Sequence, residues 1–167
     1  MKMQRNWHLG LTALVLFGAA PAPAEAPQET ANKKLVLDFY NELYKGEADG
    51  NLKDRIAGIA EKYMLPDYIQ HNPAFAGSGG GRDAFIHAMQ QQPARPPNPN
   101  FKPPETVEVM AERDRVMLFT KREVPGGRDG QPASVYIFNM FRIKDGKFAE
   151  HWDAGAGPPG GGTRESR

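Results

Sequence analysis

The sequence predicts an α+β domain in which helices come first and pack on one side of a curved antiparallel sheet. Between residues 33 and 91, apolar residues recur at the three- and four-residue spacing of amphipathic helices. From residue 106 to residue 153, short runs rich in Val, Ile, Phe, Met and Thr are separated by turns, as strands are. Helices followed by a run of strands are typical of one helical layer on an antiparallel sheet.

Three helices are expected in the first half of the chain. Leu35, Val36 and Phe39 place apolar side chains on one face of the first, and Gly46 ends it. Pro66 stops the second helix, because proline cannot continue the hydrogen-bond ladder. A short extended stretch follows before the turn at Asn72-Pro73. The expected helices span residues 33–45, 52–65 and 82–91, and the extended stretch spans 68–71.

Four strands are expected in the second half. Asp145-Gly146 is the strongest local signal, since this pair favours the two-residue turn of a hairpin. The Pro-rich segment 93–104 is incompatible with a helix or an inner strand, so an ordered loop is expected there. The expected strands span residues 106–111, 115–123, 134–144 and 147–153.

Side-chain alternation assigns faces to the last two strands. His151 and Asp153 share one face of the last strand, and alternation puts Phe148, Glu150 and Trp152 on the other. Both faces of strand 134–144 are largely apolar. One layer of helices covers only one face, so the second is expected to meet a partner chain or to line an internal cavity.

Both ends of the chain have compositions that differ from the domain. Residues 1–24 combine Lys2 and Arg5 with a short apolar run and small residues ending in Ala22-Pro-Ala24, which is typical of a cleaved signal peptide. We therefore expect an exported, periplasmic or secreted protein without stable membrane insertion after cleavage. The predicted divisions are a signal peptide at 1–24, a leader at 25–32, the domain at 33–153 and a flexible Gly/Pro-rich tail at 154–167.

Composition excludes several classes of function. The 167 residues carry 21 Lys and Arg against 20 Asp and Glu, a balance that argues against a nucleic-acid partner. Cysteine is absent, so disulfides, thiol catalysis and thiolate metal sites are excluded. Gly77–Gly81 lacks the Lys-Ser or Lys-Thr of a phosphate-binding loop.

Polar residues at strand ends are the candidates for chemistry. Asp153 follows aromatic residues, so its charged form would be disfavoured there and it could act as a general base; the alternative is an exposed strand end. His151 and His71 are candidate donors or proton carriers, and the alternative for each is a purely structural role. Gln70 and Asn72 flank His71 and suit hydrogen bonding to a ligand. A metal site made of the two histidines and Asp153 is disfavoured, because no local spacing demands one.

Three segments occur in a characteristic order: Tyr68-Ile-Gln-His-Asn-Pro73, then Gly81-Arg82, then Asp145-Gly-Lys147 leading into Glu150-His-Trp-Asp153. With these segments in this order, the sequence resembles the SnoaL-like family of the NTF2-like superfamily. The resemblance implies a cone-shaped α+β barrel around a pocket, and a homodimer packed through the outer sheet face. It also implies an enzyme without cofactor or metal that performs acid/base chemistry on a small carbonyl compound, such as aldol-type cyclisation, isomerisation or dehydration.

Under this resemblance, Asp153 would be the catalytic base, with His71 and His151 as catalytic donors or proton partners. The ligand-binding residues would be Gln70, Asn72, Asn139, Tyr40, Tyr63, Phe85 and Phe141. An export signal is unusual for such an enzyme, and the Gly-rich sequence after Asp153 departs from the family pattern. A non-catalytic domain that binds a ligand or forms a dimer therefore remains the alternative.

Overall fold

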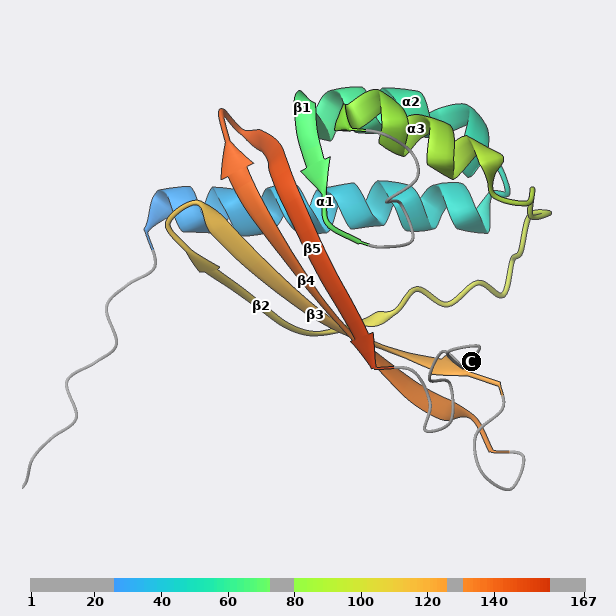
Figure 1. Ribbon diagram of the computed structural model, residues 1–167. Coiled ribbons are helices and arrows are strands. Elements are labelled where there is room, and N and C mark those ends of the chain that lie inside the picture. The colour runs from blue at the N-terminus through green and yellow to red at the C-terminus, as the bar shows by residue number, and fades with distance from the viewer. Residues whose placement is uncertain (1–25, 73–79, 126–130, 157–167) are drawn as a thin grey trace, which may run out of the picture.

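The computed structural model describes residues 26–72, 80–125 and 131–156, which form three helices and a five-stranded sheet (Figure 1). The helices lie on one face of the sheet, as the sequence predicted. The elements are α1 (Pro27–Ala48), α2 (Leu52–Tyr63), β1 (Met64–Gln70), α3 (Gly81–Gln91), β2 (Glu105–Glu112), β3 (Arg115–Val124), β4 (Ala133–Lys144) and β5 (Lys147–Ala156).

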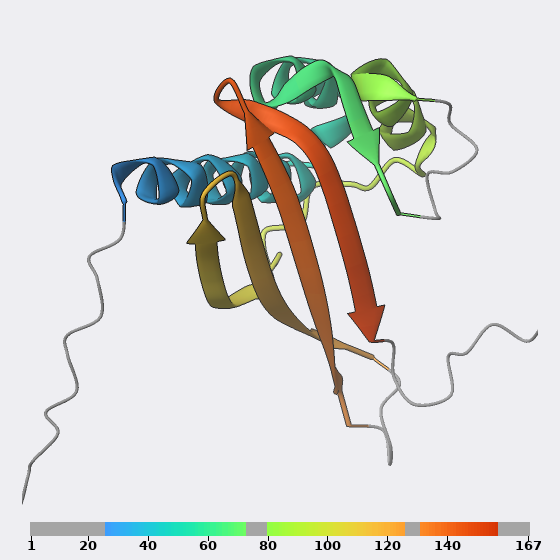
Figure 2. The ribbon, with the colours of Figure 1, turned by 60° about the vertical axis from the view of Figure 1, so that its left-hand side comes forward.

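The sheet is strongly twisted and open, with the strand order β1-β5-β4-β3-β2 (Figure 2). Four strands form an antiparallel series, as expected. The expectation of a wholly antiparallel sheet is wrong for β1, which pairs parallel to β5, with Gln70 opposite His151. Parallel pairing is possible because α3 and the strands β2 to β4 separate β1 from β5 in the chain. This pairing places the end of β1 beside the end of β5.

Helix α1 begins six residues before the expected start at Lys33, so residues 27–32 are not a leader outside the fold. Pro27 stands at the first helical position, where its missing N–H is no loss, and the Glu29 carboxylate accepts a hydrogen bond from the Ala26 N–H at 3.2 Å. The side-chain amide of Asn32 donates to the Arg113 carbonyl at 3.0 Å. This contact fixes the first turns of α1 to the turn between β2 and β3.

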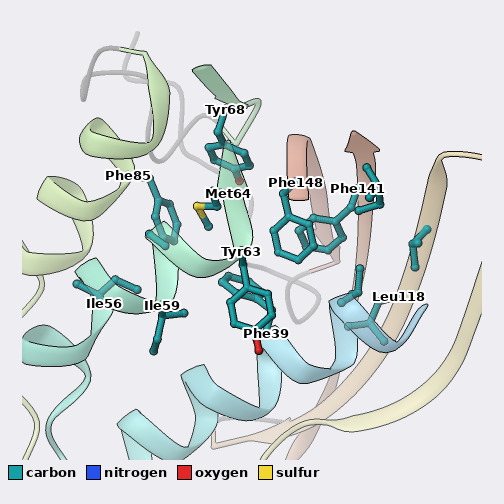
Figure 3. Packing of buried hydrophobic residues seen from close by; sticks show 14 residues of the cluster. Phe39, Ile56, Ile59, Tyr63, Met64, Tyr68, Phe85, Leu118, Phe141 and Phe148 are labelled. Carbon is teal, nitrogen blue, oxygen red and sulfur yellow. The ribbon is translucent and has the colours of Figure 1, made fainter. Parts of the chain in front are cut away.

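The hydrophobic core lies between the helices and the inner face of the sheet (Figure 3). Its centre is a group of aromatic rings, in which Phe39 contacts Phe148 at a centroid distance of 5.0 Å and Tyr63 at 5.5 Å. Phe141 lies 4.6 Å from Phe148 on the neighbouring strand. Without disulfides, burial of these rings between the helices and the sheet is the main stabilising interaction of the domain.

The Pro-rich segment is an ordered loop, as predicted, and it packs against the end of α1. The Asn98 N–H donates to the Ala48 carbonyl at 2.8 Å. Gly50 has a φ of +69°, and a Cβ at this position would lie 2.5 Å from the Pro97 nitrogen. Only glycine combines this backbone angle with such a close approach of the loop.

The β4–β5 hairpin has the predicted Asp-Gly turn, with positive φ at both Asp145 and Gly146. The face predicted for Phe148 is wrong. Arg142 pairs with Glu150 but Ile143 pairs with Phe148, so Ala149 is an extra residue in β5. This bulge reverses the alternation, and Phe148 therefore lies in the core on the same face as His151.

The second face of β4 is exposed in the described part of the chain, because all three helices cover the other face. Among the described residues, this face is open to solvent and does not line an internal cavity. Phe138 retains 48% of its accessible surface, and Met110 on β2 retains 50%. Tyr136 and Met140, on either side of Phe138 along the same face, are also exposed. We call these four residues the outer apolar patch.

Parts of three predictions lie outside the described residues: the signal peptide at 1–24, most of the Gly-rich segment 77–81, and the tail from 157 onward. The expected tail begins too early, since β5 continues through residues 154–156. No helix in the described ranges is long and apolar enough to cross a membrane.

Candidate functional site

Polar side chains from α1, β1, β4 and β5 meet beyond the aromatic core, on the inner face of the sheet. Asn139 on β4 is paired with Asp153 on β5, and Phe141 is paired with His151 two residues along. The parallel register of β1 places Gln70 opposite His151. Residues that are far apart in the sequence thus form one cluster, which we call the inner polar cluster: Tyr40, Gln70, Asn72, Asn139, His151 and Asp153.

His151 is the centre of this cluster and is 7% exposed. Its Nδ1 lies 3.0 Å from the Gln70 amide nitrogen, and its Nε2 lies 3.2 Å from Asn139 Oδ1. An amide nitrogen only donates and an amide oxygen only accepts. Nδ1 therefore accepts a hydrogen bond and Nε2–H donates one, which defines a single neutral tautomer.

The surroundings of His151 favour this neutral form. The imidazole stacks on the ring of Phe141, with the ring centroids 4.2 Å apart and an angle of 9° between the ring planes. Burial lowers the pKa of His151 to about 4, although the negative charge of Asp153 acts in the opposite direction. At neutral pH the imidazole is thus an uncharged hydrogen-bonding group fixed in orientation, and not a cation.

Tyr40 of α1 extends the cluster from the helical layer. Its hydroxyl donates to Asn139 Oδ1 at 2.8 Å, so this oxygen accepts from both Tyr40 and His151. Burial raises the pKa of Tyr40 well above its usual value of 10, and Asp153 adds to the effect. The phenol therefore stays protonated and remains a donor across the physiological range.

Asp153, the last residue of the cluster along the chain, is half-buried. Its Oδ2 accepts a hydrogen bond from the Asn72 side-chain amide at 2.8 Å. The Asn72 backbone N–H donates to Gln70 Oε1 at 3.2 Å, which links this contact back to His151. Two of the predicted ligand contacts, Gln70 and Asn72, thus orient the predicted base and its neighbouring imidazole.

His71 does not join this cluster, contrary to the expected convergence of His71, His151 and Asp153. Its Nε2 lies 3.0 Å from Glu150 Oε2, and its ring stacks on Trp152 at 4.6 Å and 4°. Glu150 and Trp152 lie on the face of β5 opposite His151, because side chains alternate along a strand. His71 follows Gln70 directly, so the same alternation turns it outward.

Besides Tyr40, the other three predicted aromatic contacts have different positions. Phe141 is fully buried beneath His151, and Phe85 of α3 contacts the ring of Tyr68. Tyr63 lies in the core, and its hydroxyl donates to Glu42 at 2.8 Å, away from the inner polar cluster. The structure therefore brings the first two next to the site and leaves Tyr63 outside it.

Tyr68 is a site residue to which sequence analysis gave no role. It stands two residues before Gln70 and is 1% exposed. Its buried hydroxyl has no hydrogen-bond partner within the described residues. Side chains alternate between the two faces of a strand, so the two-residue spacing of Tyr68 and Gln70 places them on one face of β1. This spacing is the feature of the sequence that indicates Tyr68 as a site residue.

Within the described ranges, no group of three or more acidic or His side chains is placed to hold a metal ion. A cleft of about 150 Å³ lies elsewhere, at the far ends of α1 and α3, where Leu52, Met89 and Arg95 contribute to its lining. None of the residues of the inner polar cluster lines this cleft.

The comparisons with known proteins agree with this architecture. An NTF2-like protein of unknown function from Burkholderia pseudomallei K96243 is 17% identical with a TM-score of 0.51, over 74% of this chain and 89% of that chain. An LEH-like epoxide hydrolase from M. tuberculosis is 15% identical with a TM-score of 0.53, over 78% and 86%. Likeness at these identities shows the fold. No curated protein sequence matches this chain. Residues 34–155 match the family described as SnoaL-like polyketide cyclase. Because this match covers well over half of the sequence, the chain belongs to the SnoaL-like polyketide cyclase family.

Proposed function

We propose that the domain binds a small, mostly apolar carbonyl compound against the inner polar cluster and that Asp153 acts as the base. The observation that carries the proposal is the convergence of Asp153 with neutral hydrogen-bonding groups on one inner face, in a chain of a polyketide cyclase family. Apolar surroundings with a few fixed polar groups suit an uncharged ligand.

The proposed step is proton abstraction next to a carbonyl. The Asp153 carboxylate removes a proton from the carbon beside the carbonyl, and the electron pair of the broken C–H bond forms an enolate. In an aldol-type cyclisation, the enolate carbon then forms a C–C bond with a second carbonyl of the same molecule, whose oxygen takes up a proton. Donors fixed before the reaction stabilise the enolate oxygen without reorganising. The same first step serves isomerisation and dehydration.

Exchange of carbon-bound hydrogen for deuterium tests this step without knowledge of the natural substrate. The protein is incubated in D₂O with acetylacetone or 2-tetralone, and NMR measures loss of the proton signals beside the carbonyl. Asp153→Asn should abolish the protein-dependent exchange. Asp83→Asn is the matched control, because Asp83 on α3 has a side chain that is 90% exposed. Exchange that is equal in the parent and in Asp153→Asn would refute the role of Asp153.

A non-catalytic binding domain is the second candidate. The polar groups around His151 satisfy one another, with Gln70 and Asn139 occupying both ring nitrogens. Such a closed network favours a rigid binding surface over proton transfer by the imidazole. Ligand-induced thermal stabilisation without deuterium exchange or turnover would support this candidate against the first.

We also propose a homodimer in which two outer apolar patches face each other. The exposure of Phe138 and Met110 supports this proposal, because large contiguous apolar surfaces on a folded domain mark association sites. Phe138→Glu should convert a dimer to a monomer in size-exclusion chromatography with light scattering. A monomeric parent protein would refute the dimer.

Export is a further proposal, supported by the composition of residues 1–24. Mass spectrometry of protein recovered from cells tests it. A mature chain that begins between Glu25 and Pro27 is expected, and an intact N-terminus would contradict export by cleavage.

A further inference from the structure

Among the described residues, the hydroxyl of Tyr68 is a buried donor without a hydrogen-bond partner. The residue is 1% exposed, and no described group accepts a hydrogen bond from its oxygen. A buried polar group without a partner costs free energy, and most such groups in proteins are paired. By contrast, the hydroxyl of Tyr63, which is equally buried as a residue, donates to Glu42 at 2.8 Å.

Tyr68 is held beside the inner polar cluster. It shares the inner face of β1 with Gln70, which donates to His151. The rings of Tyr68 and Phe85 pack edge to face, with their centroids 6.1 Å apart. Figure 3 shows Tyr68 on β1 next to Phe85 on α3. Asn72 links Asp153 by hydrogen bonds to Gln70, which lies two residues beyond Tyr68 on β1. In agreement with this arrangement, the charge of Asp153 contributes to the raised pKa values of both Tyr68 and Tyr40.

The protonation state of Tyr68 suits a permanent donor. Burial raises the pKa of its hydroxyl far above the usual value of 10, and the nearby negative charge of Asp153 adds to the effect. The phenol therefore keeps its proton at physiological pH. Tyr40 differs in one respect, because its proton is already donated to Asn139.

We propose that the Tyr68 hydroxyl donates a hydrogen bond to an oxygen of the bound ligand, so that the site selects carbonyl, enol or phenol compounds whose acidic hydrogen faces Asp153. The inference rests on the proposed function and names its substrate class. When Asp153 takes the proton, negative charge develops on the ligand oxygen, where a donor stabilises it most. The ligand in turn satisfies a hydroxyl for which the described residues supply no acceptor.

Binding of 4-nitrophenol tests the donor separately from catalysis. At a pH that ionises this probe, titration calorimetry measures its affinity for the full chain carrying Asp153→Asn, where the neutral amide stands in for a protonated carboxyl group. Adding Tyr68→Phe should weaken binding roughly tenfold or more, since hydrogen bonds to charged groups are strong. Adding Tyr63→Phe should leave the affinity unchanged.

Thermal unfolding without ligand supplies a second measurement. Tyr68→Phe should keep or raise the melting temperature, because its hydroxyl makes no hydrogen bond to any described residue. Tyr63→Phe should lower the melting temperature, because the bond to Glu42 is lost. Any of three results would overturn the inference. The probe affinity could be equal with and without Tyr68→Phe, or the probe could bind neither the Asp153→Asn protein nor the parent. The third such result is a melting temperature lowered by Tyr68→Phe. Tyr68-dependent binding combined with Asp153-independent deuterium exchange would refute the proposed base and leave the donor standing.

Discussion

His151 should make the fold sensitive to mild acid. Its pKa falls from 6.5 to about 4 on folding, chiefly through burial, so between these values the unfolded chain binds a proton that the folded chain does not. The free energy of unfolding therefore decreases as the pH falls from 6.5 toward 4. At 1.36 kcal/mol for each pKa unit, the whole effect is about 3 kcal/mol, of which about 2 kcal/mol is reached between pH 7 and pH 5.

Urea unfolding followed by circular dichroism at pH 7 and pH 5 measures this difference. The interval avoids most of the titration of carboxylates such as Glu42 and Glu150, whose pKa values are lowered by hydrogen-bonded partners. His151→Gln should remove the loss of stability between the two pH values, whatever its effect at pH 7. His87→Gln, which replaces an exposed histidine on α3, should retain the loss.

The reasoning fails if His151→Gln shows the same loss between pH 7 and pH 5 as the parent protein. An NMR titration gives an independent check, because the ring signals of His151 should stay unchanged from pH 7 to pH 5. Titration of that ring near pH 6.5 would mean that the Gln70 and Asn139 contacts do not hold the neutral tautomer.

Three further predictions concern stability. Gly50→Ala should destabilise the fold by about 2 kcal/mol or more, because the positive φ and the contact with Pro97 exclude a Cβ. Gly58 lies on the exposed surface of α2 with open space around it, so Gly58→Ala should stabilise the fold by up to about 1 kcal/mol. Equal urea midpoints for these two variants would contradict this account. Phe148→Ala should cost about 3–5 kcal/mol in urea unfolding, since it opens a cavity among the core rings; a cost below about 1 kcal/mol would mean that the core is not packed as described. Glu150→Gln removes the charge bound by Arg142 and His71 and should lower stability by about 1 kcal/mol at pH 7. Hydrogen bonds to His71 and Arg142 lower the pKa of Glu150, so the loss should shrink as the pH falls through that lowered value. A loss in urea unfolding that does not change with pH would show that charge is not involved.

Much of the fold follows from local patterns. The apolar period along 33–91 indicates helices because successive turns must present one face to the core. Alternation does the same for strands, and Asp145-Gly146 determines the hairpin through the positive φ of both residues. The common face of His151 and Asp153 also follows from their two-residue spacing alone.

The composition of the site depends on long-range pairing, which leaves no local signal. Parallel pairing of β1 with β5 brings Gln70 to His151. Because successive side chains point to opposite faces, His71 then lies beside Glu150 and Trp152 on the other face. The sequence identifies His71 as polar and near a turn, but the face on which it lies depends on the strand that β1 joins.

What the sequence by itself determined is the order of elements, the apolar faces and the position of the acid at the end of the last strand. Only the tertiary structure decided which polar groups surround that acid. The bulge at Ala149 places Phe148 on the inner face. Packing of α1 against the sheet brings Tyr40 to the cluster, and pairing of β1 with β5 brings Tyr68 there. The physical reason is that periodicity depends on neighbours in the chain, whereas register, bulges and helix packing depend on the free energy of contacts between distant segments.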